Sequence, residues 1–106
     1  MHFLNIFFGS SKRKIKAFQL RNAIIIDVRT KEEFATGGIK NAINIPLNEI
    51  GQKIDTIKNY NKPVITCCVA GVRSRTAANI LKTNGIKAIN GGGWISLNKK
   101  LQFNPL

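Results

Sequence analysis

Short apolar runs alternate with helical stretches along the chain from residue 22 onward. The run AIIID at residues 23–27 is rich in β-branched residues and shows no polar alternation, as expected for a strand that is covered on both faces. Similar runs predict three further strands, AINI at 42–45, VITC at 64–67 and IKAIN at 86–90. The chain is therefore predicted to alternate between strands and helices.

Helix signals occupy the segments between these strands. They predict a helix at 31–36 opened by a Thr30–Glu33 capping box, a helix capped by Asn48 that buries Ile50, Ile54 and Ile57, and a helix from Ser74 to a stop at Asn84 and Gly85. The sequence GGGW is expected to leave the fourth strand toward a last short helix or coil. Strands separated by helices imply right-handed crossovers and a parallel sheet, which binds ligands at the carboxyl ends of its strands.

The chain of 106 residues has the size of one domain, but its first residues differ from the rest. We treat 1–16 as an apolar and basic segment and 17–106 as the domain. The apolar run at 3–8 is much shorter than the roughly 20 residues that span a bilayer, and the charge at 12–16 follows it, unlike that of a secretory signal. Its helical spacing makes weak contact of residues 3–16 with an anionic membrane surface an alternative to packing on the domain.

The charge balance is strongly basic, with 17 Lys and Arg against 5 Asp and Glu and a formal net charge of +12. Such a field attracts small oxyanions, nucleic acids and acidic lipids, although a solvated basic surface is the simpler interpretation. No aromatic residues interleave with the dense basic run at 12–16. We therefore expect no specific nucleic-acid partner.

Two adjacent cysteines, Cys67 and Cys68, close the third predicted strand. A disulfide between neighbours is strained, and there is no second pair, so we expect free thiols in a reducing compartment and a cytoplasmic location. The only histidine, His2, is far from the cysteines in the sequence. We therefore expect no metal site, and nothing in the sequence calls for a cofactor.

The segment CVAGVRS follows the third strand and precedes a helix. A tight loop at such a place directs backbone N–H groups toward its centre and forms a nest for an anion, and Gly71 permits the backbone conformation that this requires. The helix dipole and the charge of Arg73 add to the positive potential. A cysteine at the mouth of this nest is expected to be held as the thiolate, which is the reactive form.

The stretches IIDVRTKEEF, AINIPL, KPVITCCVAGVRSRTAANIL and NGGGW, in this order, resemble a single-domain rhodanese over residues 24 to about 97. The resemblance implies an α/β fold, with a small parallel β-sheet of four to five strands and helices on both faces. It also implies an extra strand before the first one, for which residues 2–8 are a candidate.

The same resemblance implies a sulfurtransferase. Cys68 matches the nucleophile, which accepts a sulfane sulfur from a small anionic donor such as thiosulfate, becomes a persulfide, and passes the sulfur to cyanide, a thiol or a protein thiol. The residues that match the cradle around this sulfur, and that are expected to bind the substrate, are Val69, Ala70, Gly71, Val72, Arg73 and Ser74. A non-catalytic or relay binding module of the same fold is the alternative.

Cys67 offers a competing interpretation. Five residues separate it from Arg73, which is the spacing of cysteine-dependent phosphatases, whereas four separate Cys68 from Arg73. Successive strand residues point to opposite faces, so both thiols cannot line one nest, and Cys67 is expected to fill the core. The phosphatase signature also has a histidine where Thr66 stands. We therefore favour Cys68.

Five further residues recur in the motifs, and we expect structural roles for most of them. Asp27 and Arg29 are expected to hold the end of the first strand, and Glu33 to complete the capping box. Trp94 is expected to pack against the glycine turn, and a position on the rim over the pocket is the alternative. Gly38 stands where the resembled family often has histidine, which removes a polar group but leaves the nucleophile loop intact.

Overall fold

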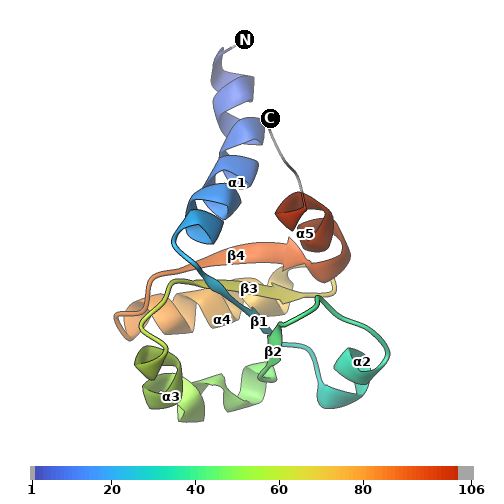
Figure 1. Ribbon diagram of the computed structural model, residues 1–106, viewed down its shortest axis with the longest axis vertical. Helices are drawn as coiled ribbons and strands as arrows, with labels where there is room; N and C mark the ends of the chain where they lie inside the picture. The colour runs from blue at the N-terminus through green and yellow to red at the C-terminus, as the bar shows by residue number, and fades with distance from the viewer. Residues whose placement is uncertain (1, 103–106) are drawn as a thin grey trace.

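Four parallel strands form the central sheet (Figure 1). The computed structural model describes the backbone of residues 2–102 and the side chains of residues 11–102. The strands lie in the order β2-β1-β3-β4, and their bounds are β1 Ile24–Asp27, β2 Ile43–Asn44, β3 Val64–Cys68 and β4 Ala88–Gly93. The expected small parallel sheet is therefore confirmed.

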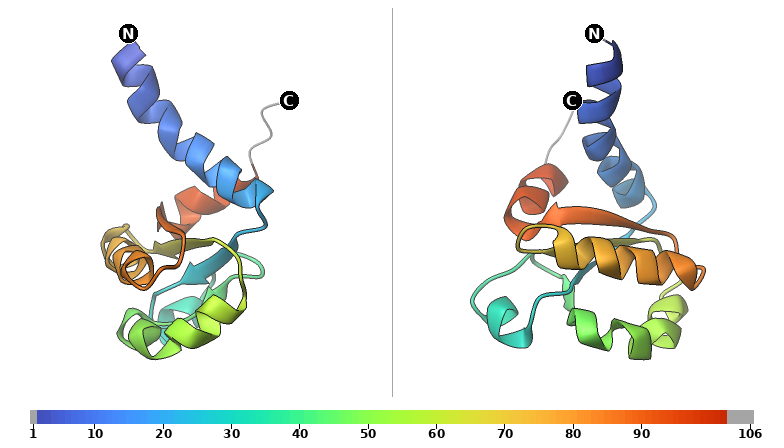
Figure 2. Two further views of the ribbon diagram at one scale, coloured as in Figure 1. Left: turned by 90° about the vertical axis from the view of Figure 1, so that its left-hand side faces the viewer. Right: turned by 180° about the vertical axis from the view of Figure 1, so that it is seen from behind.

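Helices cover both faces of this sheet, as expected (Figure 2). Their bounds are α1 His2–Leu20, α2 Lys31–Ala35, the 3-10 helix η1 Leu47–Lys53, α3 Ile54–Asn59, α4 Val72–Thr83 and α5 Trp94–Leu101. Side chains of η1, α3 and α4 pack on one face, and side chains of α1 and α5 pack on the other. Two apolar cores result, one on each side of the sheet.

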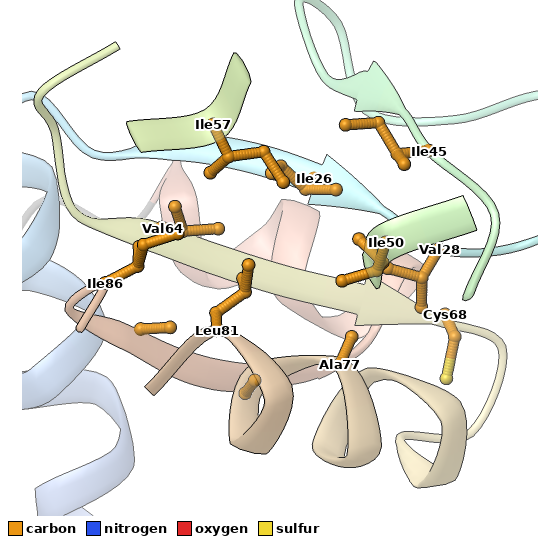
Figure 3. Close-up of a cluster of buried hydrophobic side chains, with 12 residues drawn as sticks. Ile26, Val28, Ile45, Ile50, Ile57, Val64, Cys68, Ala77, Leu81 and Ile86 are labelled. Atoms are coloured by element: carbon orange, nitrogen blue, oxygen red, sulfur yellow. The ribbon is translucent and has the colours of Figure 1, made fainter. Parts of the chain in front are cut away.

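Strand β3 divides its side chains between the two cores. All five of its residues are buried, since it is paired on both sides and covered on both faces. Val64 and Cys68 belong to the core that packs against α4, and Figure 3 shows their side chains together with Ala77 of that helix. Cys67 belongs to the core under α1 and α5. The prediction that the two thiols point to opposite faces is confirmed, because strand side chains alternate with a period of two.

Helix α1 corrects the prediction that residues 2–8 form an extra strand. Apolar residues at positions 3, 4, 7 and 8 recur with the helical period instead of alternating, which favours the helix. The helix runs through residue 16, where we divided the chain into two parts, and that division stays a prediction. Ile15 and Phe18 anchor its second half in the core. No helix within residues 2–102 is long and apolar enough to cross a membrane.

The helix after β2 begins differently from the prediction. Pro46, not Asn48, is the residue that precedes η1, and Asn48 lies inside the first turn. The proline has φ −54°, already close to helical values, and its carbonyl accepts a hydrogen bond from the Glu49 amide at 2.8 Å. The Asn48 cap is therefore wrong, whereas the buried positions Ile50 and Ile57 are confirmed. Ile54, the third position of the predicted stripe, is only partly buried.

Four boundaries of the elements β3, α4 and β4 also differ from the prediction. Strand β3 includes Cys68, and α4 begins at Val72 instead of Ser74. Strand β4 starts at Ala88 and runs through the three glycines, which were expected to leave the strand. Its pairing with β3 passes from Thr66–Asn90 to Cys68–Gly93, so one extra residue of β4 forms a bulge. Pairing with the central strand overrides the weak strand preference of glycine.

The other local signals are confirmed. Thr30 and Glu33 make both hydrogen bonds of the capping box at the start of α2. Helix α4 ends at Thr83 with Asn84 as its C-cap, and Gly85 follows with φ +81°. The chain after the glycines forms α5, which buries Leu97.

Candidate active site

Cys68 occupies the carboxyl end of β3, and the chain turns from there directly into α4. Val69 and Ala70 make the turn, and Gly71 has φ +97°, a left-handed conformation that favours glycine. This geometry places the first turn of α4 over the end of a central strand. Such an edge is where open parallel sheets bind ligands.

Two groups of the loop contact the Cys68 sulfur. The Gly71 amide donates a hydrogen bond to Sγ at 3.1 Å, and the Ser74 hydroxyl oxygen lies 3.3 Å from Sγ. Burial of the side chain, which is 1% exposed, raises the pKa of Cys68. Hydrogen bonds from the Ser74 hydroxyl and from the amides of Ser74, Gly71 and Ala70 outweigh burial, so the pKa lies below that of an ordinary thiol. The site therefore favours the nucleophilic thiolate.

Cys67 has the opposite environment. Its side chain is fully buried on the other face of the sheet. Burial, and then the negative charge of Asp27, raise the pKa of Cys67 far above that of an ordinary thiol. The two neighbouring thiols therefore differ in environment, because the pKa of Cys68 is lowered and that of Cys67 is raised.

Ser74 is buried next to the sulfur, whereas other residues of the loop are exposed to solvent. Ser74 is fully buried in the third position of α4 and faces the sulfur. Val69 and Val72 are 57% and 61% exposed, and Ala70 is exposed as well. The structure therefore brings Gly71 and Ser74 to the sulfur, whereas the other three residues form an apolar rim.

Arg73 is held by a partner that the sequence did not reveal. Its guanidinium makes two hydrogen bonds to the Glu33 carboxylate, at 2.8 and 3.1 Å. The bonds from Arg73 and from the Thr30 amide lower the pKa of Glu33 to about 2. Glu33 therefore does more than complete the capping box, because it also ties α2 to the first turn of α4. The positive charge of Arg73 stays next to the loop. The hydrogen bonds to Glu33, and then the negative charges of Glu33 and of an ionised Cys68, raise the pKa of Arg73.

Asn90 is the second residue that sequence analysis missed. Its side-chain carbonyl Oδ1 accepts hydrogen bonds from the Ser74 hydroxyl at 2.6 Å and from the Gly92 amide at 2.9 Å. Its Nδ2 donates to the Gly71 carbonyl at 3.0 Å. The available signal was a polar residue directly before the glycines, but its meaning depends on β4 lying beside β3.

A buried ion pair holds the end of β1. Asp27 and Arg29 are 0% and 3% exposed, and Arg29 Nη2 lies 2.8 Å from Asp27 Oδ2. The same guanidinium donates to the carbonyls of Glu33 and Gly37 and lies 4.7 Å from the Trp94 ring. The expected structural role of this pair is confirmed. Trp94 packs on Arg29, and its ring also lies next to Gly37. The expected packing of Trp94 against the glycine turn stays a prediction.

Gly38 has a steric explanation. A Cβ atom at this position would lie 2.6 Å from Phe34 Cε1 and 3.1 Å from Arg29 Nη2. The contact with the Phe34 ring is too short for a side chain at position 38 while the ring stays where it is. A histidine at this position, as in the resembled family, would therefore require the Phe34 ring to move.

The chain matches a family model. The model describes a rhodanese-like domain and matches residues 11–94, which is most of the chain. The chain therefore belongs to the rhodanese-like domain family. Its four-stranded parallel sheet and the helices on both faces are those of this fold.

Similar proteins agree with this assignment. The chain is 44% identical over 69 residues to the uncharacterized protein YqhL of Bacillus subtilis, covering 65% of this chain and 54% of that protein. It is 36% identical over 69 residues to the thiosulfate sulfurtransferase PspE of Escherichia coli, covering 64% of this chain and 66% of that protein. The crystal structure of a rhodanese-like domain protein from Staphylococcus aureus aligns with a TM-score of 0.64 at 38% identity, covering 72% of this chain and 74% of that one.

Several relatives are considerably longer than the matching region. The chain spans 54% of the length of YqhL and 27% of the length of the tRNA uridine(34) hydroxylase of Buchnera aphidicola, to which it is 29% identical over 85 residues. Relatives named thiosulfate sulfurtransferase or putative sulfurtransferase support sulfur transfer as the general activity of the family.

Proposed function

We propose that the protein is a sulfurtransferase that carries a sulfane sulfur on Cys68. The observation that supports this most directly is the pair of contacts at the sulfur, from the Gly71 amide at 3.1 Å and from Ser74 at 3.3 Å, in a site that lowers the pKa of Cys68. Relatives named thiosulfate sulfurtransferase support the same reaction.

The proposed reaction has two displacements. With thiosulfate as the donor, the Cys68 thiolate attacks the sulfane sulfur, a new S–S bond forms, and the bond to the sulfonate breaks, so that sulfite leaves with the electron pair. In the second step, cyanide or a thiolate attacks the outer sulfur of the persulfide, and Cys68 leaves as a thiolate. Both steps begin or end with an ionised Cys68, which the loop amides stabilise without a separate base.

Residues of the loop have distinct parts in this proposal. The amides of Ala70, Gly71 and Ser74 stabilise the negative charge on sulfur. Arg73, fixed by Glu33, adds a positive potential beside the loop that attracts an anionic donor. The side chains of Val69 and Val72 form the exposed rim through which donor and acceptor approach.

The test is sulfur loading followed by intact mass spectrometry. Wild type and the matched variants Cys67→Ser and Cys68→Ser are incubated with thiosulfate and desalted, and their intact masses are measured. We expect wild type and Cys67→Ser to gain one sulfur atom each and to lose it again as thiocyanate when cyanide is added. Loading of Cys68→Ser, or no loading of Cys67→Ser, would refute the assignment. The same pair of variants tests a Cys67 phosphatase, since hydrolysis of an aryl phosphate that persists in Cys68→Ser would support it.

A relay module is the second candidate, and the apolar rim favours it. Val69 and Val72 are more than half exposed although they flank a sulfur that is 1% exposed, which suits a protein partner that covers the rim. In this version, the persulfide passes to a protein thiol. Turnover with cyanide separates the two, because a relay would load with sulfur and yet transfer little of it to a small acceptor.

We also propose a reducing, cytoplasmic setting, because both cysteines are free thiols. Contact of residues 3–16 with a membrane surface stays a prediction, and residues 3–10 lie outside the described side chains. Cell fractionation tests both statements. Recovery of the protein in the membrane fraction, with release by high salt, would support the surface contact, and recovery in the soluble cytoplasmic fraction alone would contradict it.

A further inference from the structure

The Ser74 hydroxyl has two competing acceptors. Its oxygen lies 2.6 Å from Asn90 Oδ1 on one side and 3.3 Å from the Cys68 sulfur on the other. A hydroxyl group has a single hydrogen, so it donates to only one of them at a time. Which acceptor it chooses depends on the charge of the sulfur.

The orientation of the Asn90 amide is fixed by two backbone groups. Its Oδ1 accepts from the Gly92 amide at 2.9 Å, and its Nδ2 donates to the Gly71 carbonyl at 3.0 Å. Exchange of the two ends would place an NH2 group against the Gly92 N–H and an oxygen against the Gly71 carbonyl. The atom that faces Ser74 is therefore the carbonyl oxygen, which is an acceptor only.

The protonated thiol fits this arrangement. The Cys68 S–H donates to the Ser74 oxygen, and the Ser74 O–H donates to Asn90 Oδ1, so each hydrogen has an acceptor. After the sulfur loses its proton to water, the same orientation would leave an anionic sulfur and a hydroxyl oxygen at 3.3 Å with no hydrogen between them. A hydrogen bond to an ionised acceptor is roughly twice as strong as one between neutral groups, so the hydroxyl turns toward the sulfur.

We propose that Asn90 and the Cys68 sulfur compete for the Ser74 hydrogen, so that Asn90 stabilises the resting thiol and releases the hydroxyl when the thiolate forms. Asn90 is thus a positioning residue that acts through Ser74. This inference deepens the proposed function, because it concerns the sulfur that we assign as the nucleophile. In the second displacement, the released hydroxyl would stabilise Cys68 as it leaves.

The surrounding charges limit how the inference is tested. The charged and titratable groups near the network lie on five elements around it: Arg73 and Lys82 on α4, Glu33 on α2, Asp27 and Arg29 at the end of β1, Lys14 on α1, which lines the same cavity as Asn90, and Cys67 on β3. The variants leave all six charged residues unchanged. Cys67→Ser serves as the common background, so that only one thiol reacts.

The sign of the effect separates competition from bracing. If Asn90 competes for the hydrogen, Asn90→Ala frees the hydroxyl for the sulfur and lowers the pKa of Cys68. If Asn90 only braces the loop through its bond to the Gly71 carbonyl, the same change loosens the Gly71 amide, which favours the thiolate, and the pKa rises. The two roles therefore predict opposite shifts.

The experiment measures the rate of alkylation by iodoacetamide as a function of pH, because only the thiolate reacts. We expect Asn90→Ala to lower the midpoint by about half a pH unit to one unit, the difference between a charged and a neutral hydrogen bond. Added to Ser74→Ala, it should cause no further shift. The control Asn79→Ala removes an exposed amide of α4 that takes no part in this network, and should leave the midpoint unchanged.

An unchanged or higher midpoint in Asn90→Ala would overturn the inference, and so would an equal shift with and without the Ser74 hydroxyl. Because alkylation requires no sulfur donor, these outcomes are independent of thiosulfate loading. Failure of loading with the predicted midpoints would contradict the proposed function alone. Normal loading with a higher midpoint in Asn90→Ala would contradict only the role of Asn90.

Discussion

Asp27→Asn tests how much the buried ion pair contributes to the stability of the site. In the native protein, the Asp27 carboxylate accepts hydrogen bonds from the amide, Nε and Nη2 of Arg29 at 2.8 to 3.0 Å. Both side chains are almost completely buried, at 0% and 3% exposure. The substitution keeps the shape of the side chain, but it removes the negative charge and turns one acceptor oxygen into an NH2 group that faces a donor.

The expected cost follows from the charge that remains. Loss of one partner of a buried pair leaves the guanidinium without a counter-charge, which costs about 3–5 kcal/mol of unfolding free energy. A domain of this size has a total stability of about 5–15 kcal/mol. We therefore expect the urea unfolding midpoint of Asp27→Asn to fall by at least about 1 M, with partial unfolding at 37 °C if the starting stability is low.

Equilibrium unfolding in urea, followed by circular dichroism, provides the measurement. Asp55→Asn is the matched control, because Asp55 is exposed in the first turn of α3, where loss of the charge costs about 0.3–1 kcal/mol. The double variant Asp27→Leu/Arg29→Met leaves no buried charge and should recover part of the loss. A loss in Asp27→Asn no larger than that of Asp55→Asn would refute the reasoning.

Three further predictions concern the elements around the site. Thr30→Ala removes the hydroxyl that accepts a hydrogen bond from the Glu33 amide in the capping box, and its urea unfolding free energy should fall by about 1 kcal/mol. Ile50→Ala creates a cavity under the sheet, and should cost about 2–5 kcal/mol in the same assay because Ile50 is completely buried. In Glu33→Gln, the free energy of unfolding should fall less steeply than in wild type as the pH is lowered below 4.5. The folded pKa of Glu33, about 2, lies below its ordinary 4.5, so its contribution is complete above pH 4.5 and is lost as the pH falls toward 2.

Each of these predictions has a clear contradiction. A Thr30→Ala variant as stable as wild type would mean that α2 does not depend on its cap. A loss below about 1 kcal/mol in Ile50→Ala would mean that η1 collapses into the space. If the free energy of unfolding decreases equally with falling pH in wild type and in Glu33→Gln, the contact between Glu33 and Arg73 is not maintained in solution.

Much of the molecule was predictable because its signals are local. The β-branched runs marked the four strands, and the Thr30–Glu33 spacing marked α2. The opposite orientation of Cys67 and Cys68 required only the two-residue period of a strand. Such properties depend on neighbouring positions along the chain, and so a single sequence contains them.

Tertiary structure decided the contacts that set the chemistry of Cys68. Asn90 reaches Ser74 only because β4 lies beside β3. Glu33 contacts Arg73, 40 positions further along the chain, because α2 and α4 both begin at the carboxyl ends of the parallel strands. The glycines stay in β4 because a neighbouring strand pairs with them. Strand order and helix placement depend on the packing of two cores, each built from residues that are far apart in the sequence. Contacts of this kind produce no periodic pattern along the chain. The amino-acid sequence by itself thus determined which residues could form a reactive loop, whereas the folded arrangement decided which groups hold it.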